Sequence, residues 1–337
     1  MKERSSSIRR RAARWLLRAL AAMALVLAAG CTYQSIREAD ARRFSPPGRL
    51  VDLGGRRLHL TCEGEGRPTV LMEAGGTQFS TQYARIQREL APHVRACAYD
   101  RAGMGWSDPS PRPASAGALA DDLAALVQAA ELPPPYVLVG SSAGGLPLEL
   151  FARAHPGEVA GLVLLDALAA RMLDDLPDDA ERLRRDARLA RVLNRIGALW
   201  VIDPLRRGEL PEERRELEIA LTYRNTTWQA VVSLLDSAAE SAKELRAMAP
   251  LRGDLRLLVI SRDDQGPLAS AGSTEEVAFE ERWQAQQVLS AARSSRGRRL
   301  VAKGSGHHIT EDRPDLVVAE LLQLIAEIRA EEASPPY

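Results

Sequence analysis

Residues 137–145 read VLVGSSAGG, an apolar run that ends in two serines followed by three small residues. Gly140 and Gly144 stand two positions on either side of Ser142, the spacing of a strand that turns sharply into a helix and exposes a serine at the apex. Glycines suit such a turn because the strand and the helix approach each other closely. The five residues alone also fit a glycine-rich loop before a helix, so the surrounding elements decide between the two interpretations.

Strands and helices alternate along most of the chain. Apolar or alternating runs predict eight strands: a hairpin within 49–64, and single strands that begin near 68, 94, 135, 159, 255 and 298. Helical spacing is expected in the segment before Leu90, over 115–131, 146–154 and 276–292, and in the last segment to about 330. This order predicts an α/β fold with a mostly parallel, doubly wound sheet.

The alternation is interrupted once. Residues 167–250 are rich in Leu, Arg, Asp and Glu with helical periodicity, and the next strand begins only near 255. The insertion follows the sixth strand, on the side where ligands enter such sheets. We therefore expect a core of 49–166 and 251–332 with a helical lid at 167–250.

The first 30 residues read as a targeting segment. They hold seven Lys/Arg and one acid, followed by an apolar run over 19–29 and then Gly30 and Cys31. This order is typical of a secretory signal rather than a spanning helix, and the cysteine makes it resemble a bacterial lipoprotein signal, cleaved before an acylated Cys31. Ala28 stands where that signal usually has Leu. An uncleaved membrane anchor and a twin-arginine signal at 9–11 are the alternatives.

Every one of these interpretations places the folded domain outside the cytoplasm. Residues 31–48 are charged and contain proline, which suits a tether between membrane and domain. Without the first 30 residues, 38 basic and 44 acidic residues remain, a formal charge of −6. This balance gives no indication of nucleic-acid binding.

His307 lies in GSGHHIT, after the last predicted strand. A neutral imidazole there could take the proton from the Ser142 hydroxyl, which is otherwise a weak nucleophile. The adjacent His308 is expected to be a loop neighbour. His59, His93 and His155 lack companions at ligand spacing, so we expect no metal and no cofactor.

Four segments together resemble the α/β-hydrolase fold over about 49–330: EAGG at 73–76, YDRAGMGWSD at 99–108, VLVGSSAGG at the turn, and SGHHITEDRPDLV at 305–317. Ser141 departs from that family, which usually has His before the nucleophile. The resemblance implies a serine nucleophile at Ser142, a base at His307, and an oxyanion hole formed by the backbone N–H groups of Gly76 and Ala143.

The acid that would orient His307 has three candidates. Asp166, directly after the sixth strand, is favoured; Asp263 and then Asp264, after the seventh strand, are the alternatives. A solvated loop aspartate or a helix cap is the ordinary interpretation of each. The same fold would place the strands of Cys62 and Cys97 side by side, so a disulfide between these cysteines is expected in an exported domain.

The sequence thus predicts a lipid-anchored, exported serine hydrolase of the bacterial cell envelope that cleaves a carboxylic ester or similar acyl bond through an acyl-enzyme. The expected partners are a small acyl substrate and, through Cys31, the membrane. Leu199, Trp200, Val201 and Trp228 could wall an acyl pocket or simply pack within the lid. A ligand-binding or sensor protein on the same fold is the alternative function.

Overall fold

The computed structural model of the 337-residue chain describes residues 2–175, 177–202, 212–263 and 274–333. Two compact units divide the chain. The smaller unit comprises Met1–Ser45 and Arg185–Trp228, and the larger unit comprises Pro46–Arg184 and Gln229–Tyr337.

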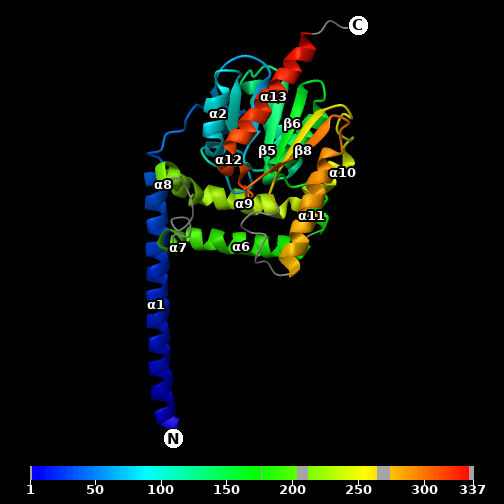
Figure 1. Cartoon of the computed structure of the whole chain (residues 1–337). Coiled ribbons are helices and arrows are strands. Elements are labelled where there is room, and N and C mark those ends of the chain that lie inside the picture. Colours follow the sequence, from blue (N-terminus) through cyan, green and yellow to red (C-terminus); the bar gives the residue numbers. More distant parts are fainter. Residues whose placement is uncertain (1, 176, 203–211, 264–273, 334–337) are drawn as a thin grey trace. The chain divides into compact units, whose positions relative to one another are not determined.

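The larger unit is built on an eight-stranded sheet with the order β1-β2-β4-β3-β5-β6-β7-β8 (Figure 1). The strands are β1 Arg49–Asp52, β2 Arg57–Glu63, β3 Thr69–Glu73, β4 Ala96–Tyr99, β5 Tyr136–Ser141, β6 Val159–Leu165, β7 Arg256–Arg262 and β8 Gly297–Ala302. β2 pairs antiparallel with β1 and with β4, and the remaining pairs are parallel. The predicted fold class, a mostly parallel sheet with an antiparallel hairpin at one edge, is confirmed.

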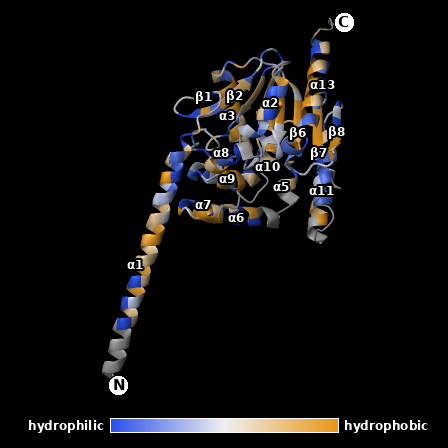
Figure 2. Cartoon of the chain, turned by 60° about the vertical axis from the view of Figure 1, so that its left-hand side comes forward, coloured by the Kyte–Doolittle hydropathy of each residue, from blue (hydrophilic) through white to orange (hydrophobic). Residues whose placement is uncertain are grey.

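Both faces of the sheet are covered by helices, because the central strands are apolar on both sides (Figure 2). In β5, Val137 and Val139 belong to the cluster that contains α2 (Ala84–Leu90) and α13 (Pro314–Glu332). Leu138 belongs to the opposite cluster, with α3 (Ala116–Ala129) and α4 (Gly145–Ala154). The core is closed by α11 (Thr274–Ala291) and by the short α12 (Ile309–Asp312).

Cys62 and Cys97 lie directly opposite each other in β2 and β4 and form a disulfide with a Cα–Cα distance of 4.0 Å. The bond closes a sequence separation of 35 residues. A loop of this size stabilises the folded chain by about 3 to 4 kcal/mol in the chain-entropy account. The disulfide agrees with the prediction and with an oxidising compartment.

The insertion after β6 is helical, and its residues are divided between the two units. Its helices are α5 Met172–Asp175, α6 Pro177–Arg195, α7 Ala198–Ile202, α8 Glu212–Thr222, α9 Asn225–Asp236 and α10 Ala238–Ala247. α10 is fastened to the start of α3: Ser241 Oγ accepts from Ala116 N at 2.9 Å, and Glu244 accepts from Gly117 N at 2.8 Å. These bonds satisfy free N–H groups of the α3 terminus, so α10 belongs to the core unit.

The smaller unit contains α1 (Lys2–Ala41) together with the end of α6, α7, α8 and the start of α9. Among the described residues, the segment Arg11–Ala41 is the one helix long and apolar enough to cross a membrane (Figure 2). α1 continues without a break through Cys31. The first part of the expected tether of 31–48 is therefore helical. This part of α1 packs within the smaller unit, where Gln34 is buried and donates to Tyr223 O at 2.7 Å.

Candidate active site

The turn after β5 holds Ser142 in a left-handed conformation with φ of +50°. Residues 140 and 144, two positions on either side, must be glycine because neither has room for a Cβ. A Cβ on Gly140 would lie 2.8 Å from Gly145 Cα, and one on Gly144 would lie 2.5 Å from Ala74 O. The strained serine is therefore held by close backbone approaches on both sides, as the VLVGSSAGG pattern predicts. Ser141, the last residue of β5, is buried beneath the turn.

Ser142, His307 and Asp166 form a hydrogen-bonded line across the carboxyl ends of β5, β6 and β8. Ser142 Oγ lies 3.0 Å from His307 Nε2, and His307 Nδ1 lies 2.6 Å from Asp166 Oδ2. A carboxylate only accepts, so Nδ1 carries the proton and Nε2 is left to accept from the serine hydroxyl. This is the tautomer that a general base for Ser142 requires.

Asp166 is fixed by more than His307. It is fully buried, follows β6 with φ of +43°, and accepts from Trp283 Nε1 at 2.8 Å and from Arg262 Nη1 at 3.0 Å. Burial alone would raise the pKa of Asp166, but the hydrogen bond from His307 and the charge of Arg262 outweigh it, so the pKa lies below its ordinary value. The carboxylate is thus charged over the whole neutral range.

Of the two alternative acids, the structure describes only Asp263, and its carboxylate binds elsewhere. Asp263 turns to the end of β8, where its Oδ2 accepts from Gly304 N at 2.8 Å. Asp264 lies outside the described residues. The geometry therefore favours Asp166 for the acid, while the role of that acid in a reaction stays a prediction.

The loop after β3 brings a second backbone donor toward the serine. A Cβ on Gly76 would lie 3.7 Å from Ala143 Cβ, so the two residues expected to form the oxyanion hole are neighbours. Arg101 holds this loop from below: Nη1 donates to Ala74 O at 2.6 Å and Nη2 donates to Gly75 O at 2.6 Å. With these two carbonyls bound by one rigid guanidinium, the course of the chain into Gly76 is fixed.

Glu73 lies at the buried end of the same network. Its carboxylate pairs with Arg101 at 3.3 Å and accepts from the Tyr99 hydroxyl. Burial raises the pKa of Glu73 to about 7, against the opposing effects of Arg101 and Tyr99.

The segment at 99–108 is tied to neighbouring segments by the buried side chain of Asp100. Asp100 is buried and accepts from Ser80 N at 2.7 Å and from His59 Nδ1 at 2.8 Å. Gly105 has φ of +49°, and a Cβ there would lie 2.1 Å from Asp100 Oδ2.

His308, the neighbour of His307, contacts the loop after β3: its Nδ1 lies 3.1 Å from Gln78 Nε2. Burial, and to a smaller extent the nearby His307, lower the pKa of His308.

Four supporting residues were missed by the sequence analysis: Glu73, Arg101, Arg262 and Trp283. Arg101 lies within the segment 99–108 that resembles the family, but no short motif predicts that its side chain binds the loop after β3. Arg262 and Trp283 come from β7 and α11, and only the folded chain brings them to Asp166. Four residues were expected either to wall an acyl pocket or to pack within the insertion. Three of them, Leu199, Trp200 and Trp228, share a cluster within the smaller unit, which is the second alternative, and Val201 is exposed.

Comparisons with known proteins agree with this architecture. An uncharacterized protein of Schizosaccharomyces pombe is 32% identical over 162 residues, which cover 39% of this chain. The chain spans less than half of the length of this relative and of another curated relative, 30% and 43%. The activity of either whole relative is therefore not attributed to this chain.

Solved structures share the fold at low identity. A thermophilic esterase from Thermogutta terrifontis superposes with a TM-score of 0.59 and 23% identity, over 83% of this chain and 98% of that chain. The enol-lactonase from Burkholderia xenovorans superposes with a TM-score of 0.59 and 19% identity, over 82% and 100%. The family profile described as alpha/beta hydrolase family matches residues 66–320, which include all the strands after the opening hairpin and all three members of the hydrogen-bonded line. On this match and this sheet, the chain belongs to the alpha/beta hydrolase family.

Proposed function

We propose that this protein is a serine hydrolase that cleaves a carboxylic ester or a similar acyl bond, with Ser142 as nucleophile, His307 as general base and Asp166 as the orienting acid. The observation that carries the proposal is the continuous line from Ser142 Oγ through the His307 ring to Asp166, with separations of 3.0 and 2.6 Å. The structural neighbours include an esterase and an enol-lactonase, which are enzymes for bonds of this kind, and this supports the reaction class.

In the acylation step, His307 Nε2 takes the hydroxyl proton as Ser142 Oγ attacks the carbonyl carbon of the substrate. The carbonyl oxygen becomes an oxyanion, which the N–H groups of Gly76 and Ala143 would bind. His307 then donates its proton to the leaving alkoxide as the carbon–oxygen bond breaks. Asp166 stabilises the imidazolium that exists between these two transfers.

In the deacylation step, water takes the place of the alcohol. His307 removes a proton from the water as the water oxygen attacks the acyl carbon. The second tetrahedral intermediate then collapses to the carboxylic acid, and His307 returns its proton to Ser142 Oγ as the bond between that oxygen and the acyl carbon breaks. An ester is the first substrate class to test because an alkoxide leaves more readily than an amine anion.

The N-terminal helix and the disulfide are compatible with export and with a membrane-bound enzyme. We infer that Cys31, which is free and exposed, carries the anchor as the acylated first residue of the mature chain. Intact-mass analysis of chain purified from membranes tests this: a mass that begins at Cys31 with added acyl groups is expected, and an unmodified chain that retains residues 1–30 would contradict it.

Hydrolysis of aryl esters of graded acyl length by the full chain in detergent tests the catalytic proposal. We expect a pre-steady-state burst of phenol equal to the amount of enzyme, because acylation releases the alcohol before water is used. Ser142→Ala should abolish the burst and lower kcat by about a million-fold, and His307→Ala should have nearly the same effect because the two residues act as a unit. A folded wild type that binds an ester without hydrolysing it would contradict the proposal and favour ligand binding.

A further inference from the structure

The smaller unit joins α1 to the turn between α6 and α7 by direct backbone contact. A Cβ on Gly30 would lie 2.2 Å from Ile196 O, and one on Gly197 would lie 2.7 Å from Gly30 O. Gly30 stands immediately after the apolar run 19–29. The α6–α7 turn therefore meets α1 where its apolar stretch ends.

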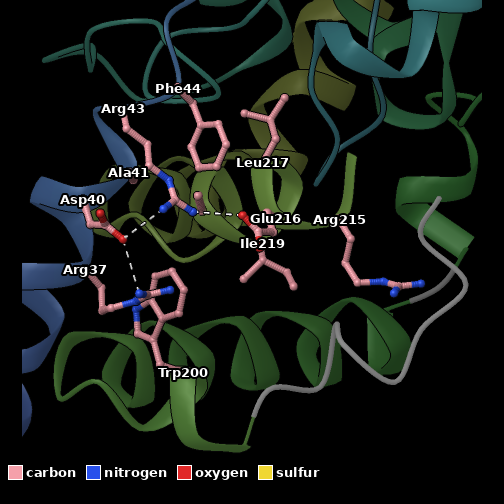
Figure 3. A pocket seen from close by; sticks show the side chains of 11 residues that line it. Arg37, Asp40, Ala41, Arg43, Phe44, Trp200, Arg215, Glu216, Leu217 and Ile219 are labelled. Carbon is pink, nitrogen blue, oxygen red and sulfur yellow. Dashed lines mark hydrogen bonds and ion pairs between the residues drawn. The ribbon is translucent and has the colours of Figure 1, made fainter. Parts of the chain in front are cut away.

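Side chains fasten the same elements along the next turns of α1. Trp200 of α7 donates from Nε1 to Gln34 Oε1 at 2.9 Å, and the Arg37 guanidinium lies 4.3 Å from the Trp200 ring centre. Further along, Arg43 pairs with Glu216 of α8 at 3.0 Å, beside a cavity of about 750 Å³ (Figure 3). The level of α7 along α1 is thus set by several independent contacts.

Residues 185–202, named here the 185–202 surface, expose apolar and basic side chains together. Leu189 and Val192 of α6 are 55% and 58% exposed, and Val201 and Ile202 of α7 are 80% and 53% exposed. The arginines of this part of α6 are also exposed, accompanied by the single acid Asp186: Arg185, Arg188, Arg191 and Arg195. Large apolar side chains among arginines are typical of helices that lie in the interface of an anionic bilayer.

The position of the bilayer follows from α1. The segment Arg11–Ala41 is long and apolar enough to cross a membrane, and Arg11, Arg14 and Arg18 lie at its N-terminal end, before the apolar run over 19–29. Basic residues are common at the cytoplasmic end of a span. An acyl group on Cys31 would place the outer boundary of the membrane at the same residue. With residues 1–30 retained, the bilayer surface lies at the level of Gly30, where the α6–α7 turn meets α1. With residues 1–30 removed, an acylated Cys31 brings the surface to the adjacent residue, and the contacts of Gln34 and Arg37 with Trp200 hold α7 there.

We propose that the 185–202 surface binds the bilayer in which the chain is anchored, with Leu189, Val192, Val201 and Ile202 inserted among the lipids and the α6 arginines on anionic headgroups. Two observations select lipid as the occupant: the contact with α1 at the end of its apolar run, and the positive charge around the exposed apolar side chains. The inference does not depend on the proposed hydrolase activity.

The test uses the full chain carrying Cys31→Ala, reconstituted into phosphatidylcholine vesicles with or without phosphatidylglycerol. Val192→Cys and Val201→Cys are labelled singly with an environment-sensitive fluorophore, and nitroxide-labelled lipids serve as quenchers. Glu327→Cys, on the exposed face of α13 in the other unit, is the matched label position. We expect several-fold stronger quenching at 192 and 201 than at 327, and a further increase with phosphatidylglycerol.

A charge test accompanies the label test. Arg191→Glu combined with Arg195→Glu should remove the increase caused by phosphatidylglycerol, whereas Arg88→Glu, an exposed arginine of α2, should leave it unchanged. Quenching at 192 and 201 no greater than at 327 would overturn the proposal. A blue-shifted emission without nitroxide quenching would also overturn it, because a second copy of the chain would then cover the surface.

Discussion

At the scale of single residues, Asp166 shows how a buried carboxylate can be kept charged by several donors. It is buried, and its hydrogen-bond partners are Trp283, Arg262 and the ring of His307. A buried carboxylate without such partners would take up a proton. Because the pKa of Asp166 is instead lowered, its carboxylate stays charged and holds the proton on His307 Nδ1.

Exchange of the acid for an amide separates the two candidate positions. Asp166→Asn keeps the size of the side chain but can donate to His307 Nδ1 and hold the wrong tautomer, so we expect kcat on an aryl ester to fall by about 10³- to 10⁴-fold. Asp263→Asn is the matched control and should change kcat less than about twofold. The reverse ranking in steady-state kinetics would assign the acid to Asp263.

Glu73 leads to a prediction about stability and pH. Its pKa is about 7 in the folded chain and 4.5 is its ordinary value, so the folded state holds a proton that the unfolded state has lost between these limits. The free energy of unfolding should therefore decrease as the pH rises from about 4.5 to 7, by up to about 3 kcal/mol.

Thermal unfolding of wild type and Glu73→Gln in the same detergent, from pH 4.5 to 8, measures this contribution. The amide cannot ionise, so the variant should lose the decline of melting temperature between pH 4.5 and 7. Parallel curves for the two proteins would show that Glu73 keeps one charge state throughout.

At the scale of elements, the site depends on how closely β3, β5 and α4 approach one another. Gly144 lets the start of α4 lie against the carbonyls at the end of β3, the same carbonyl at Ala74 that Arg101 binds from the other side. The serine turn and the loop that leads to Gly76 are thus a single packed assembly. A displacement of either element moves both expected oxyanion donors.

Alanine substitution tests this coupling. Gly144→Ala places a Cβ 2.5 Å from Ala74 O, so we expect a loss of about 1 to 3 kcal/mol in stability and a lower kcat with little change in KM. Gly157→Ala, after α4, meets nothing within 4 Å and should be neutral in both measurements. Equal effects of the two substitutions on kcat would show that the close approach at Gly144 is unimportant for the reaction.

At the scale of the whole molecule, the sequence was informative wherever local pattern determines structure. Period and turn residues located all eight strands, and the glycine spacing located Ser142. The choice among three aspartates could not be made in this way, because it depends on Arg262 and Trp283, which are distant in the sequence. The division of the 167–250 insertion between two units escaped prediction for a similar reason: it rests on bonds between α10 and α3.

The contacts of the N-terminal helix also could not be predicted from local sequence patterns. The apolar run and Cys31 were evident from composition, but the contact of Gly30 with the α6–α7 turn joins segments more than 160 residues apart. Part of the expected lid therefore packs on α1 in the smaller unit, and the remainder belongs to the larger unit, where α10 contacts α3, α4 and α5.

Labelling with a fluorophosphonate, followed by peptide mass analysis, tests the central claim most directly, because only an activated serine attacks the phosphorus rapidly. We expect the full-length wild type to carry the probe on Ser142 alone, Ser142→Ala to carry none, and His307→Ala to react far more slowly. A folded wild type that remains unlabelled, or labelling on another serine, would contradict the assignment of Ser142, His307 and Asp166 as a catalytic site.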